Sequence, residues 1–429
     1  MLWLYRLLFL PALVAMSPVY LRRMLRRGGY AADFGQRFGA HPRRLRTSAR
    51  TKRVWLQAVS VGEMLAIGPL LEGLRRDGIE VYLTTTTSTG YRLARDRYAN
   101  LVAGVGYFPL DAWPFSARAW RRIAPDLAIL TEGERWPEHL HQAAQRGVPV
   151  LSINARLSDR SFARMNRFRA LANLMLDGVT RWLPGSAQDE ARLRALGVPA
   201  EKILLTGNIK LDVQIAPLDA AARTEWRRVL GLPAGLVVLG SSTWAGEEEA
   251  LLGALRRARA SGIACSLLIV PRHAERRAEI ERVLQAAGVR FHFRSRGAAA
   301  GEVDVAVADT TGELRQLTQL ADLVFVGKSL PPHTEGQTPV EAAALEKPIL
   351  FGRGMSNFRL LARDLRERGA ALEVADPAEL AAALETLLRD PARRGALAAA
   401  AARWQRENGG AVARTLAVVR EELAHLGSR

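Results

Sequence analysis

The fold of this 429-residue chain is most clearly indicated by residues 309–358, DTTGELRQLTQLADLVFVGKSLPPHTEGQTPVEAAALEKPILFGRGMSNF. Its apolar runs and polar turns predict a helix, a strand, a loop, a second helix, a second strand and a third helix. Residues 311–314 and 336–339 open the first two helices, on either side of the strand end at residues 327–329. A helix start carries free backbone N–H groups and a partial positive charge, so it is a natural anion site. The stretch therefore predicts a phosphate site, with a sugar-nucleotide enzyme as the leading hypothesis.

The same alternation of strands and helices runs through the chain from residue 54 onward. The expected strands are VWLQAV, VYLTTTT, VGYFPL, DLAILTE, VPVLSIN, TRWLPGS and ILLTGN, and then LVVLGSS, CSLLIVP, VRFHFRS, VDVAVAD, DLVFVG, KPILFG and AALEVAD. This pattern and length predict an α/β protein with two doubly wound domains, whose ligands bind at the carboxyl ends of parallel strands. Residues 215–232 form a helical segment that we interpret as the domain connection.

The formal net charge of +18 calls for an anionic partner. Basic residues gather early in the chain, at Arg22, Arg23, Arg26, Arg27, Arg43, Arg44, Arg46, Arg50, Lys52 and Arg53. An anionic membrane face or lipid and a nucleic acid are the candidate partners. Little aromatic interleaving and no helix-turn-helix or RNA-binding signature disfavour nucleic acid. Cys265 is the only cysteine, and its strand CSLLIV indicates an inert core thiol.

Residues 1–20, MLWLYRLLFLPALVAMSPVY, are almost entirely apolar and about long enough for one membrane span. Arg6, Pro11 and Pro18 weaken that interpretation, so a shallow interfacial anchor and a helix packed on its own domain stay open. A cleaved signal peptide is disfavoured because the charge follows the apolar run. The basic flank after residue 20 indicates that the bulk of the protein lies on the cytoplasmic side.

Three S/T-x-x-E strings follow expected strands, at residues 60–63, 310–313 and 338–341. Each glutamate can close a capping box at its helix start, and the same helix start can also hold an anion or a catalytic carboxylate. Glu132 and Glu134 end another strand, where crowding would raise one carboxyl pKa. The alternative for this pair is a solvated turn.

Arginines stand at two further strand ends. Arg156 and Arg160 follow VPVLSIN, and Arg272 ends CSLLIVPR; guanidinium forks suit carboxylate or phosphate. The chain contains no D-x-D pair, no G-x-x-x-x-G-K-[ST] loop and no G-x-G-x-x-G turn, which disfavours metal catalysis and ATP hydrolysis. His139 and His141 are two apart on an expected helix and do not face one ligand.

In these strings the chain resembles the 3-deoxy-D-manno-oct-2-ulosonic acid (Kdo) transferases of lipopolysaccharide assembly. The resemblance runs nearly end to end and rests on the N-terminal segment with its basic flank, AVSVGE, TTTTSTGY, FPLDAWPF, TEGERWPE, INARLSDRSF, TGNIKLD, VPRHAER, DTTGEL, FVGKSL and TPVEAAALEKPILFG with the following NF. Each string is short, but their order and spacing are specific.

The resemblance implies a GT-B fold, with two Rossmann-like domains, a cleft between them and an N-terminal membrane anchor helix. We expect an anchor at 1–22, a basic linker at 23–53, an acceptor-binding domain at 54–215, a nucleotide-sugar domain at 216–400, and a helix at 401–429 that packs back on the first domain. It implies an inverting transfer of Kdo from CMP-Kdo to a lipid A precursor, lipid IVA, at the inner membrane, without metal or cofactor and without a nucleic-acid partner.

The resemblance also assigns residues. Glu63 would be the base that deprotonates the acceptor hydroxyl, since an inverting displacement needs one carboxylate beside the attacking oxygen. Glu134 would lie in the same acceptor-side cleft. The other acceptor-side candidates are Ser60, Gly62, Arg156 and Arg160. On the donor side, the candidates are Arg272 and the backbone of Gly312, Glu313 and Leu314 for the phosphate, Glu341 for the ribose, and Ser329, Asn208 and Lys210.

Several positions depart from the family pattern. Lys328 replaces a glycine, Gln337 and Thr338 replace His-Asn, and Gly133, Arg135 and Glu138 replace Thr, Leu and Asn. A different acidic donor sugar, a GT-B-like sugar-nucleotide epimerase and a non-enzymatic lipid- or nucleic-acid-binding protein are the alternatives.

Overall fold

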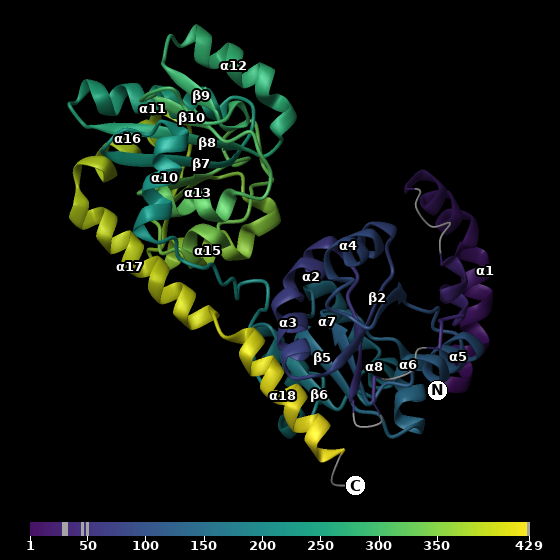
Figure 1. Ribbon diagram of the computed structural model, residues 1–429. Helices are drawn as coiled ribbons and strands as arrows, with labels where there is room; N and C mark the ends of the chain where they lie inside the picture. Colours follow the sequence, from purple (N-terminus) through teal and green to yellow (C-terminus); the bar gives the residue numbers. More distant parts are fainter. Residues whose placement is uncertain (28–32, 44–46, 49–50, 427–429) are drawn as a thin grey trace. The chain divides into compact units, whose positions relative to one another are not determined.

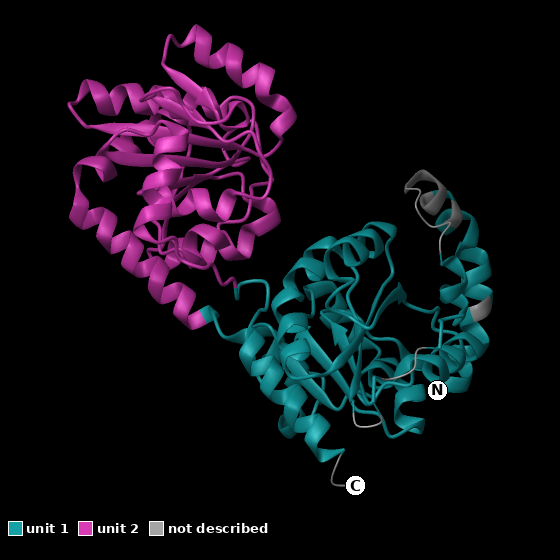
Figure 2. Ribbon diagram, viewed as in Figure 1, with its two compact units in different colours: residues 1–212, 408–429 teal, residues 213–407 magenta. Residues whose placement is uncertain are grey.

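The computed structural model describes residues 1–27, 33–43, 47–48 and 51–426. Parts of the expected basic linker 23–53 and the last three residues of the expected helix 401–429 lie outside this range. The chain divides into unit 1, residues 1–212 with 408–429, and unit 2, residues 213–407 (Figure 2). Each unit is a parallel sheet with helices on both faces (Figure 1), which confirms the predicted α/β class with two parallel-sheet domains.

The sheet of unit 1 has the strand order β3-β2-β1-β4-β5-β6, and all neighbouring strands are parallel. Its strands are β1 (Arg53–Gln57), β2 (Glu80–Thr85), β3 (Gly104–Tyr107), β4 (Leu127–Thr131), β5 (Val150–Ala155) and β6 (Arg181–Pro184). Its helices are α1 (Leu2–Arg27), α2 (Val61–Ala66), α3 (Gly68–Arg76), α4 (Ser88–Tyr98), α5 (Trp113–Ile123), α6 (Pro137–Gln145), α7 (Asp159–Arg167), α8 (Arg169–Leu176), α9 (Ala187–Ala195) and α18 (Ala411–His425), with short 3-10 turns η1 (Phe34–Phe38) and η2 (Ala200–Lys202).

The sheet of unit 2 has the order β13-β12-β11-β7-β8-β10-β9, again with all neighbours parallel. Its strands are β7 (Leu236–Thr243), β8 (Cys265–Pro271), β9 (Phe291–Phe293), β10 (Val305–Val307), β11 (Leu323–Val326), β12 (Ile349–Gly352) and β13 (Ala371–Val374). Its helices are α10 (Ala220–Leu230), α11 (Glu247–Ala260), α12 (Arg277–Ala286), α13 (Leu314–Leu320), α14 (Val340–Ala344), α15 (Arg359–Glu367), α16 (Pro377–Arg389) and α17 (Pro391–Asn408), with 3-10 turns η3 (Ala274–Arg276), η4 (Arg294–Arg296) and η5 (Ser356–Phe358).

Burial on both faces explains why these strands read as apolar runs. In β1, Val54 and Leu56 belong to the core on one face of the sheet, and Trp55 belongs to the aromatic core on the other face. The alternation follows from the two-residue period of a strand. Residues 309–358 form α13, β11, a loop, α14 and β12 in that order, which confirms the first five predicted elements. The predicted third helix is only the 3-10 turn η5 within this stretch, and α15 begins directly after it at Arg359.

Two predictions about the connections are wrong. ILLTGN forms no strand, because only Ile203 makes an isolated bridge, to Trp182 at the sheet edge. Residues 215–232 do not link the domains: α10 belongs to unit 2, where the Gln319 carbonyl accepts a hydrogen bond from Arg223 at 3.0 Å. The first crossing between the units is at Asp212 and Val213.

The C-terminal part of the chain returns to unit 1 through two helices rather than one. α17 ends at Asn408, and α18 packs on α3, with Leu416 in the core of unit 1. A Cβ at Gly73 would lie 2.4 Å from Leu416 Cδ1, so glycine allows this close approach. Asp212 accepts hydrogen bonds from the backbone of Gly410 at 3.0 Å and Val412 at 2.7 Å. These contacts fix the return of the chain onto unit 1.

Candidate active site

The strand order of unit 1 reverses between β1 and β4, which are neighbours although two strands lie between them in the sequence. In doubly wound sheets, ligands bind beside the carboxyl ends of the strands at this switch point. Glu63 lies in the first turn of α2, which follows β1, and Glu134 lies in the turn that follows β4. The fold therefore brings the two carboxylates that the sequence singled out to the same edge of one sheet.

The Glu63 carboxylate is held by four donors and is 8% exposed. It accepts hydrogen bonds from Thr131 Oγ1 at 2.6 Å, Ser60 Oγ at 2.8 Å, Val59 N at 3.1 Å and Ser60 N at 3.4 Å. Ser60 Oγ in turn accepts from Glu63 N at 3.2 Å, which confirms the capping box predicted at residues 60–63. Glu63 therefore closes its helix start, and Thr131 at the end of β4 fixes its orientation.

Glu134 is a carboxyl group with a raised pKa. Burial, above all, and the charge of Glu63 raise the pKa of Glu134 to about 7, against a hydrogen bond from Trp136 that favours the carboxylate. That bond joins Trp136 Nε1 to Glu134 Oε2 at 2.6 Å. One carboxyl pKa at this strand end is raised, but burial and Glu63 raise it, and not the crowding by Glu132 that the sequence suggested. The site thereby contains a group that exchanges a proton near neutral pH.

The Glu134 pKa predicts a pH-dependent stability. The folded value of about 7 lies above the ordinary 4.5, so the stabilisation is present in full below pH 4.5 and is lost as pH rises through 7. We expect Glu134→Gln, which lacks this titration, to gain about 2 kcal/mol of unfolding free energy relative to the parent between pH 5 and pH 8. Urea unfolding of both proteins at the two pH values measures the difference; a constant difference would contradict the assigned pKa.

A third carboxylate at this edge is paired. Glu132 forms an ion pair with Lys210 and accepts a hydrogen bond from Asn154 Nδ2 at 3.3 Å. Asn208 Oδ1 accepts from Lys210 N at 2.9 Å. Asn208 and Lys210, predicted on the donor side, thus belong to unit 1 and support the loop after β4. Both Glu132 and Asn154 adopt positive φ, at 51° and 50°, a strained conformation that clusters at functional sites.

The remaining acceptor-side candidates line the same edge as exposed residues. Ser60 and Gly62 are exposed at the start of α2, and Arg156 and Arg160 are exposed before and in the first turn of α7, which follows β5. Within the described part of the chain, neither arginine forms an ion pair with a carboxylate. Their guanidinium groups are therefore open to an anionic ligand.

In unit 2, the residues predicted for the phosphate follow β8 and β10, which are neighbouring strands. Arg272 is exposed directly after β8. Gly312 is exposed with φ 87°, and Leu314 begins α13. The capping box predicted at residues 310–313 is wrong: Glu313 is itself the N-cap and no side chain caps the helix, because Glu313 turns to Thr310 and to Arg294. The backbone of this turn is left uncapped.

The strand end at residues 327–329 does not offer the predicted phosphate cradle. Glu247, 1% exposed in the first turn of α11, accepts hydrogen bonds from the backbone N–H groups of Lys328 at 2.8 Å, Ser329 at 2.8 Å and Leu330 at 3.1 Å, and of Trp244 at 2.9 Å. A carboxylate of the chain thus fills the anion site. The Lys328 ammonium lies 3.1 Å from Glu335 and 4.2 Å from the Trp244 ring centre.

Ser329 is also not placed to contact a ligand. Its side chain is fully buried; Oγ donates to Val326 O at 2.6 Å and accepts from Gly352 N at 2.8 Å. It fixes the loop between β11 and β12. The capping box at 338–341 is likewise wrong, because Pro339 is the N-cap of α14 and no side chain caps it. Glu341 is consequently released from capping, and its buried Oε2 has no hydrogen-bond partner within the described chain.

Sequence reasoning missed three supporting residues: Thr131 and Trp136, which hold Glu63 and Glu134, and Glu247. The T-E-G-E-R-W-P-E string contains the first two, but only the pairing of β1 with β4 shows what they contact. Glu247 binds loop residues more than 80 positions away, and no local spacing signals such a contact.

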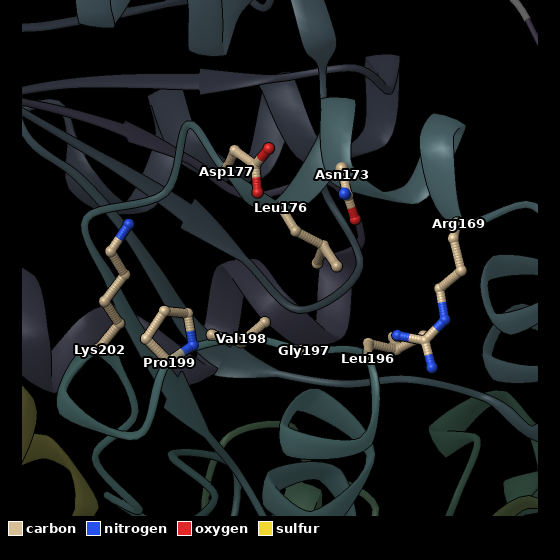
Figure 3. A pocket seen from close by; sticks show the side chains of 9 residues that line it. All are labelled: Arg169, Asn173, Leu176, Asp177, Leu196, Gly197, Val198, Pro199 and Lys202. Carbon is tan, nitrogen blue, oxygen red and sulfur yellow. The ribbon is translucent and has the colours of Figure 1, made fainter.

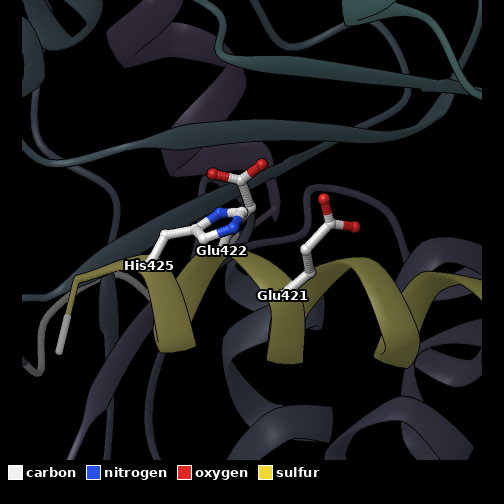
Figure 4. A group of neighbouring side chains, drawn as sticks. All are labelled: Glu421, Glu422 and His425. Carbon is white, nitrogen blue, oxygen red and sulfur yellow. The ribbon is translucent and has the colours of Figure 1, made fainter. Parts of the chain in front are cut away.

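Two other features lie apart from these strand ends. A cavity of about 360 Å³ in unit 1, lined by Arg169, Asn173 and Lys202 among others (Figure 3), lies beside Asp177, before β6 begins, and so at the opposite edge of the sheet. Glu421, Glu422 and His425 gather on α18 (Figure 4). Arg181 of β6 lies 2.7 Å from Glu421 and 2.9 Å from Glu422, so the two glutamates serve as ion pairs between β6 and α18.

Comparisons with known proteins agree with this layout. Residues 32–213 match the family of 3-deoxy-D-manno-octulosonic-acid transferases (kdotransferases). The chain is 34% identical to the 3-deoxy-D-manno-octulosonic acid transferase of Bordetella pertussis, over 85% of this chain and 86% of that protein. It is 32% identical to the Haemophilus influenzae protein of the same name, over 97% and 95%.

Solved structures show the same two-domain fold. A UDP-GlcNAc 2-epimerase from Neisseria meningitidis superposes with a TM-score of 0.56 at 13% identity, over 87% of this chain and 100% of that one. A glycosyltransferase from Rickettsia africae gives 0.56 at 12%, over 87% and 99%. At such identities the likeness shows the α/β fold of GT-B type alone, and the activity is indicated by the sequence relatives. The chain belongs to the 3-deoxy-D-manno-octulosonic acid transferase family, and it is a glycosyltransferase.

Proposed function

We propose that this enzyme transfers Kdo from CMP-Kdo to a hydroxyl of a phosphorylated lipid A precursor, lipid IVA, with inversion and without a metal ion. The observation that carries the proposal is the pair Glu63 and Glu134 at the switch point of unit 1. Glu63 takes the proton of the acceptor hydroxyl as its oxygen bonds to the anomeric carbon of Kdo. The bond from that carbon to the phosphate oxygen breaks, and CMP leaves with the electron pair. One displacement without a covalent intermediate inverts the anomeric centre.

Unit 2 would hold the leaving group. Arg272 would pair with the CMP phosphate, and the free backbone N–H groups of residues 312–314 would donate to it, which stabilises the charge that develops as CMP departs. The buried Glu341 Oε2, which has no hydrogen-bond partner in the described chain, would accept a hydrogen bond from a ribose hydroxyl. Lys328, one of the departures from the family pattern, already contacts Glu335 and Trp244. We propose that it supports the loop and that the donor sugar remains Kdo.

The first experiment incubates the purified full-length protein with CMP-Kdo and lipid IVA in EDTA. Mass spectrometry should show the acceptor gaining one or more Kdo units, and NMR of the product should show the inverted anomer. Turnover of the sugar nucleotide without any acceptor would instead favour the epimerase. Absence of a product while CMP still binds would point to another donor sugar.

The donor assignment has its own test. We expect Arg272→Ala to raise KM for CMP-Kdo by roughly 10- to 100-fold, because a charge-assisted phosphate contact contributes about 1.5–3 kcal/mol. Arg282→Ala on α12, an equally exposed arginine of unit 2, is the matched control and should leave KM within twofold. Equal KM values for the two variants would remove Arg272 from the phosphate site.

We also propose that the protein is attached to the cytoplasmic face of the inner membrane through α1. No single helix of the described chain is both long and apolar enough to cross a membrane; Leu2–Phe9 and Pro11–Tyr20, bent by 43°, would meet that test only as a pair. Large apolar side chains are exposed along α1, namely Trp3, Leu7, Val14, Met16 and Val19, each more than half exposed.

The chain is bonded to the rest of unit 1 near the start of α1 and again after the helix. Tyr5 donates to Asp111 Oδ2 at 2.6 Å, and Arg6 donates to Glu138 at 2.8 Å. Glu138 is the residue that departs from the family's asparagine, and Arg6 is its partner. Beyond the helix, Gln36 accepts from Tyr107 N at 2.9 Å. Because a single crossing would place Tyr5 and Gln36 on opposite sides of the membrane, these contacts favour a helix that lies in the membrane surface.

A label at the N-terminus tests this orientation. We expect Leu2→Cys to react with a membrane-impermeant maleimide in inverted inner-membrane vesicles but not in intact spheroplasts. Cys265 should not react in either preparation, because it is buried. The parent protein is the control. Labelling in spheroplasts alone would mean that α1 crosses the membrane.

A further inference from the structure

Unit 2 contains a groove that the proposed transfer does not use. Its volume is about 650 Å³, and it lies beyond the carboxyl ends of β12 and β13. One wall is α15 and the other is the loop at residues 331–334. Four arginines line it: Arg353, Arg359, Arg363 and Arg366. The groove is therefore strongly cationic.

The arginines form a stripe because of helical spacing. Arg359, Arg363 and Arg366 lie at positions i, i+4 and i+7 of α15, one face of an α-helix. Ala362 and Leu365 are the buried residues of α15, and Ala362 also lines the groove beside the arginines. Arg353 joins the stripe from the turn after β12.

The charges of the stripe are only partly neutralised. Arg363 pairs with Glu367 at 2.7 Å, and Arg366 lies 3.3 Å from Glu373. No carboxylate of the described residues forms an ion pair with Arg353 or Arg359, and both side chains are exposed. Arg359 also begins α15, whose start no side chain caps. Two guanidinium groups without an ion-pair partner therefore line the groove, and one of them belongs to the first residue of an uncapped helix.

The floor of the groove is held in place by backbone hydrogen bonds. Gly354 N donates to Ser329 O at 2.9 Å, and Ser356 N donates to Thr334 O at 2.9 Å. A Cβ at Gly354 would lie 2.3 Å from His333 O, so only glycine allows the two loops to meet so closely. The groove is thus a built feature of unit 2 rather than a chance gap between long side chains.

The groove is separate from the residues proposed for the CMP phosphate. Arg272 and Gly312 follow β8 and β10, whereas the groove follows β12 and β13; β11 and β7 lie between β12 and β8 in the sheet. At a spacing of about 4.8 Å, three steps across the sheet separate β12 from β8 by roughly 14 Å. One nucleotide monophosphate group cannot contact both places at once.

We infer that this groove binds a phosphate monoester, as a second anion site distinct from the nucleotide site. Such a group carries close to two negative charges at neutral pH, which match the two unpaired arginines, and its oxygens accept forked guanidinium hydrogen bonds. A single carboxylate would leave one charge unmatched. The inference does not rest on the roles proposed for Glu63 or Arg272, and it holds for a phosphate carried by a lipid as well as for free phosphate.

The test uses the full-length protein with CMP at saturation, so that the nucleotide site is filled. Calorimetric titrations at fixed ionic strength measure binding of inorganic phosphate and, separately, of monomeric dihexanoyl phosphatidic acid. We expect the parent to bind at least one probe and Arg353→Gln/Arg359→Gln to bind it at least tenfold more weakly. The matched control is Arg282→Gln/Arg393→Gln, two exposed arginines of unit 2 outside the groove, which should change binding less than twofold.

The outcomes separate the two sources of phosphate from each other and from the proposed function. Tighter binding of the phosphatidic acid assigns the groove to a lipid phosphate, and equal binding assigns it to free phosphate. Equal affinities in the parent and in Arg353→Gln/Arg359→Gln would overturn the inference. If CMP-Kdo competed with the phosphate probes, the groove would be part of the donor-sugar site, and the inference of a second, separate anion site would be wrong. Failure of Kdo transfer itself leaves these titrations unaffected.

Discussion

Glu63→Ala is expected to lower kcat by roughly 10²- to 10⁴-fold, the usual contribution of a general base, while CMP affinity stays unchanged. The carboxylate is the group placed to receive the acceptor proton, and the residues proposed for CMP belong to unit 2. The side chain also closes a capping box and accepts from Thr131, so the variant should lose about 1–2 kcal/mol of stability as well. Initial rates with CMP-Kdo and lipid IVA, together with calorimetric CMP binding, measure the two effects.

A matched control separates catalysis from capping. Glu379 is an exposed glutamate in the first turn of α16 that accepts from Ala375 N at 2.7 Å, so Glu379→Ala loses a comparable helix-start bond in unit 2. It should keep the parent's kcat. If Glu63→Ala retained turnover within a few-fold of the parent, Glu63 would be only a cap, and Glu134, whose pKa is raised to about 7, would become the candidate base.

Glu247→Ala is expected to cost unit 2 about 3–5 kcal/mol of unfolding free energy. Four backbone N–H groups donate to this buried carboxylate, and its loss leaves them without an acceptor. The loop that carries Lys328 and Ser329 should loosen, and its amides should exchange hydrogen faster. Urea unfolding and hydrogen exchange measure these changes.

Glu249 provides the control for this substitution. It lies in the same first turn of α11 but is exposed, so Glu249→Ala should change stability by less than about 0.5 kcal/mol. Both variants remove one negative charge from the same helix end, and therefore a difference between them measures the buried hydrogen bonds. Equal stabilities would mean that water replaces the carboxylate without cost.

Much of the fold follows from local rules. Strands buried on both faces need near-continuous apolar residues, and this requirement made β1 and β11 recognisable in the sequence. The capping box at residues 60–63 was also predictable, because a serine and a glutamate three positions apart satisfy each other's backbone locally. The two similar strings at 310–313 and 338–341 form no capping box, for different reasons. Glu313 is itself the N-cap, and its carboxylate bonds to the Thr310 hydroxyl and lies beside Arg294. At 338–341 the helix begins one residue later than the pattern requires, with Pro339 as the N-cap.

Apolar periodicity and motif spacing were enough to predict the two parallel-sheet domains, the family and the residue types at the strand ends, because these patterns are local to the chain. Which of those residues can exchange a proton near neutral pH or contact a ligand depends on the tertiary structure. Burial and the nearby charge of Glu63 raise the pKa of Glu134. The Glu247 carboxylate accepts hydrogen bonds from the backbone N–H groups at residues 328 and 329, where the sequence predicted a phosphate site. Both depend on groups far apart in the chain, since desolvation and hydrogen bonding act through space.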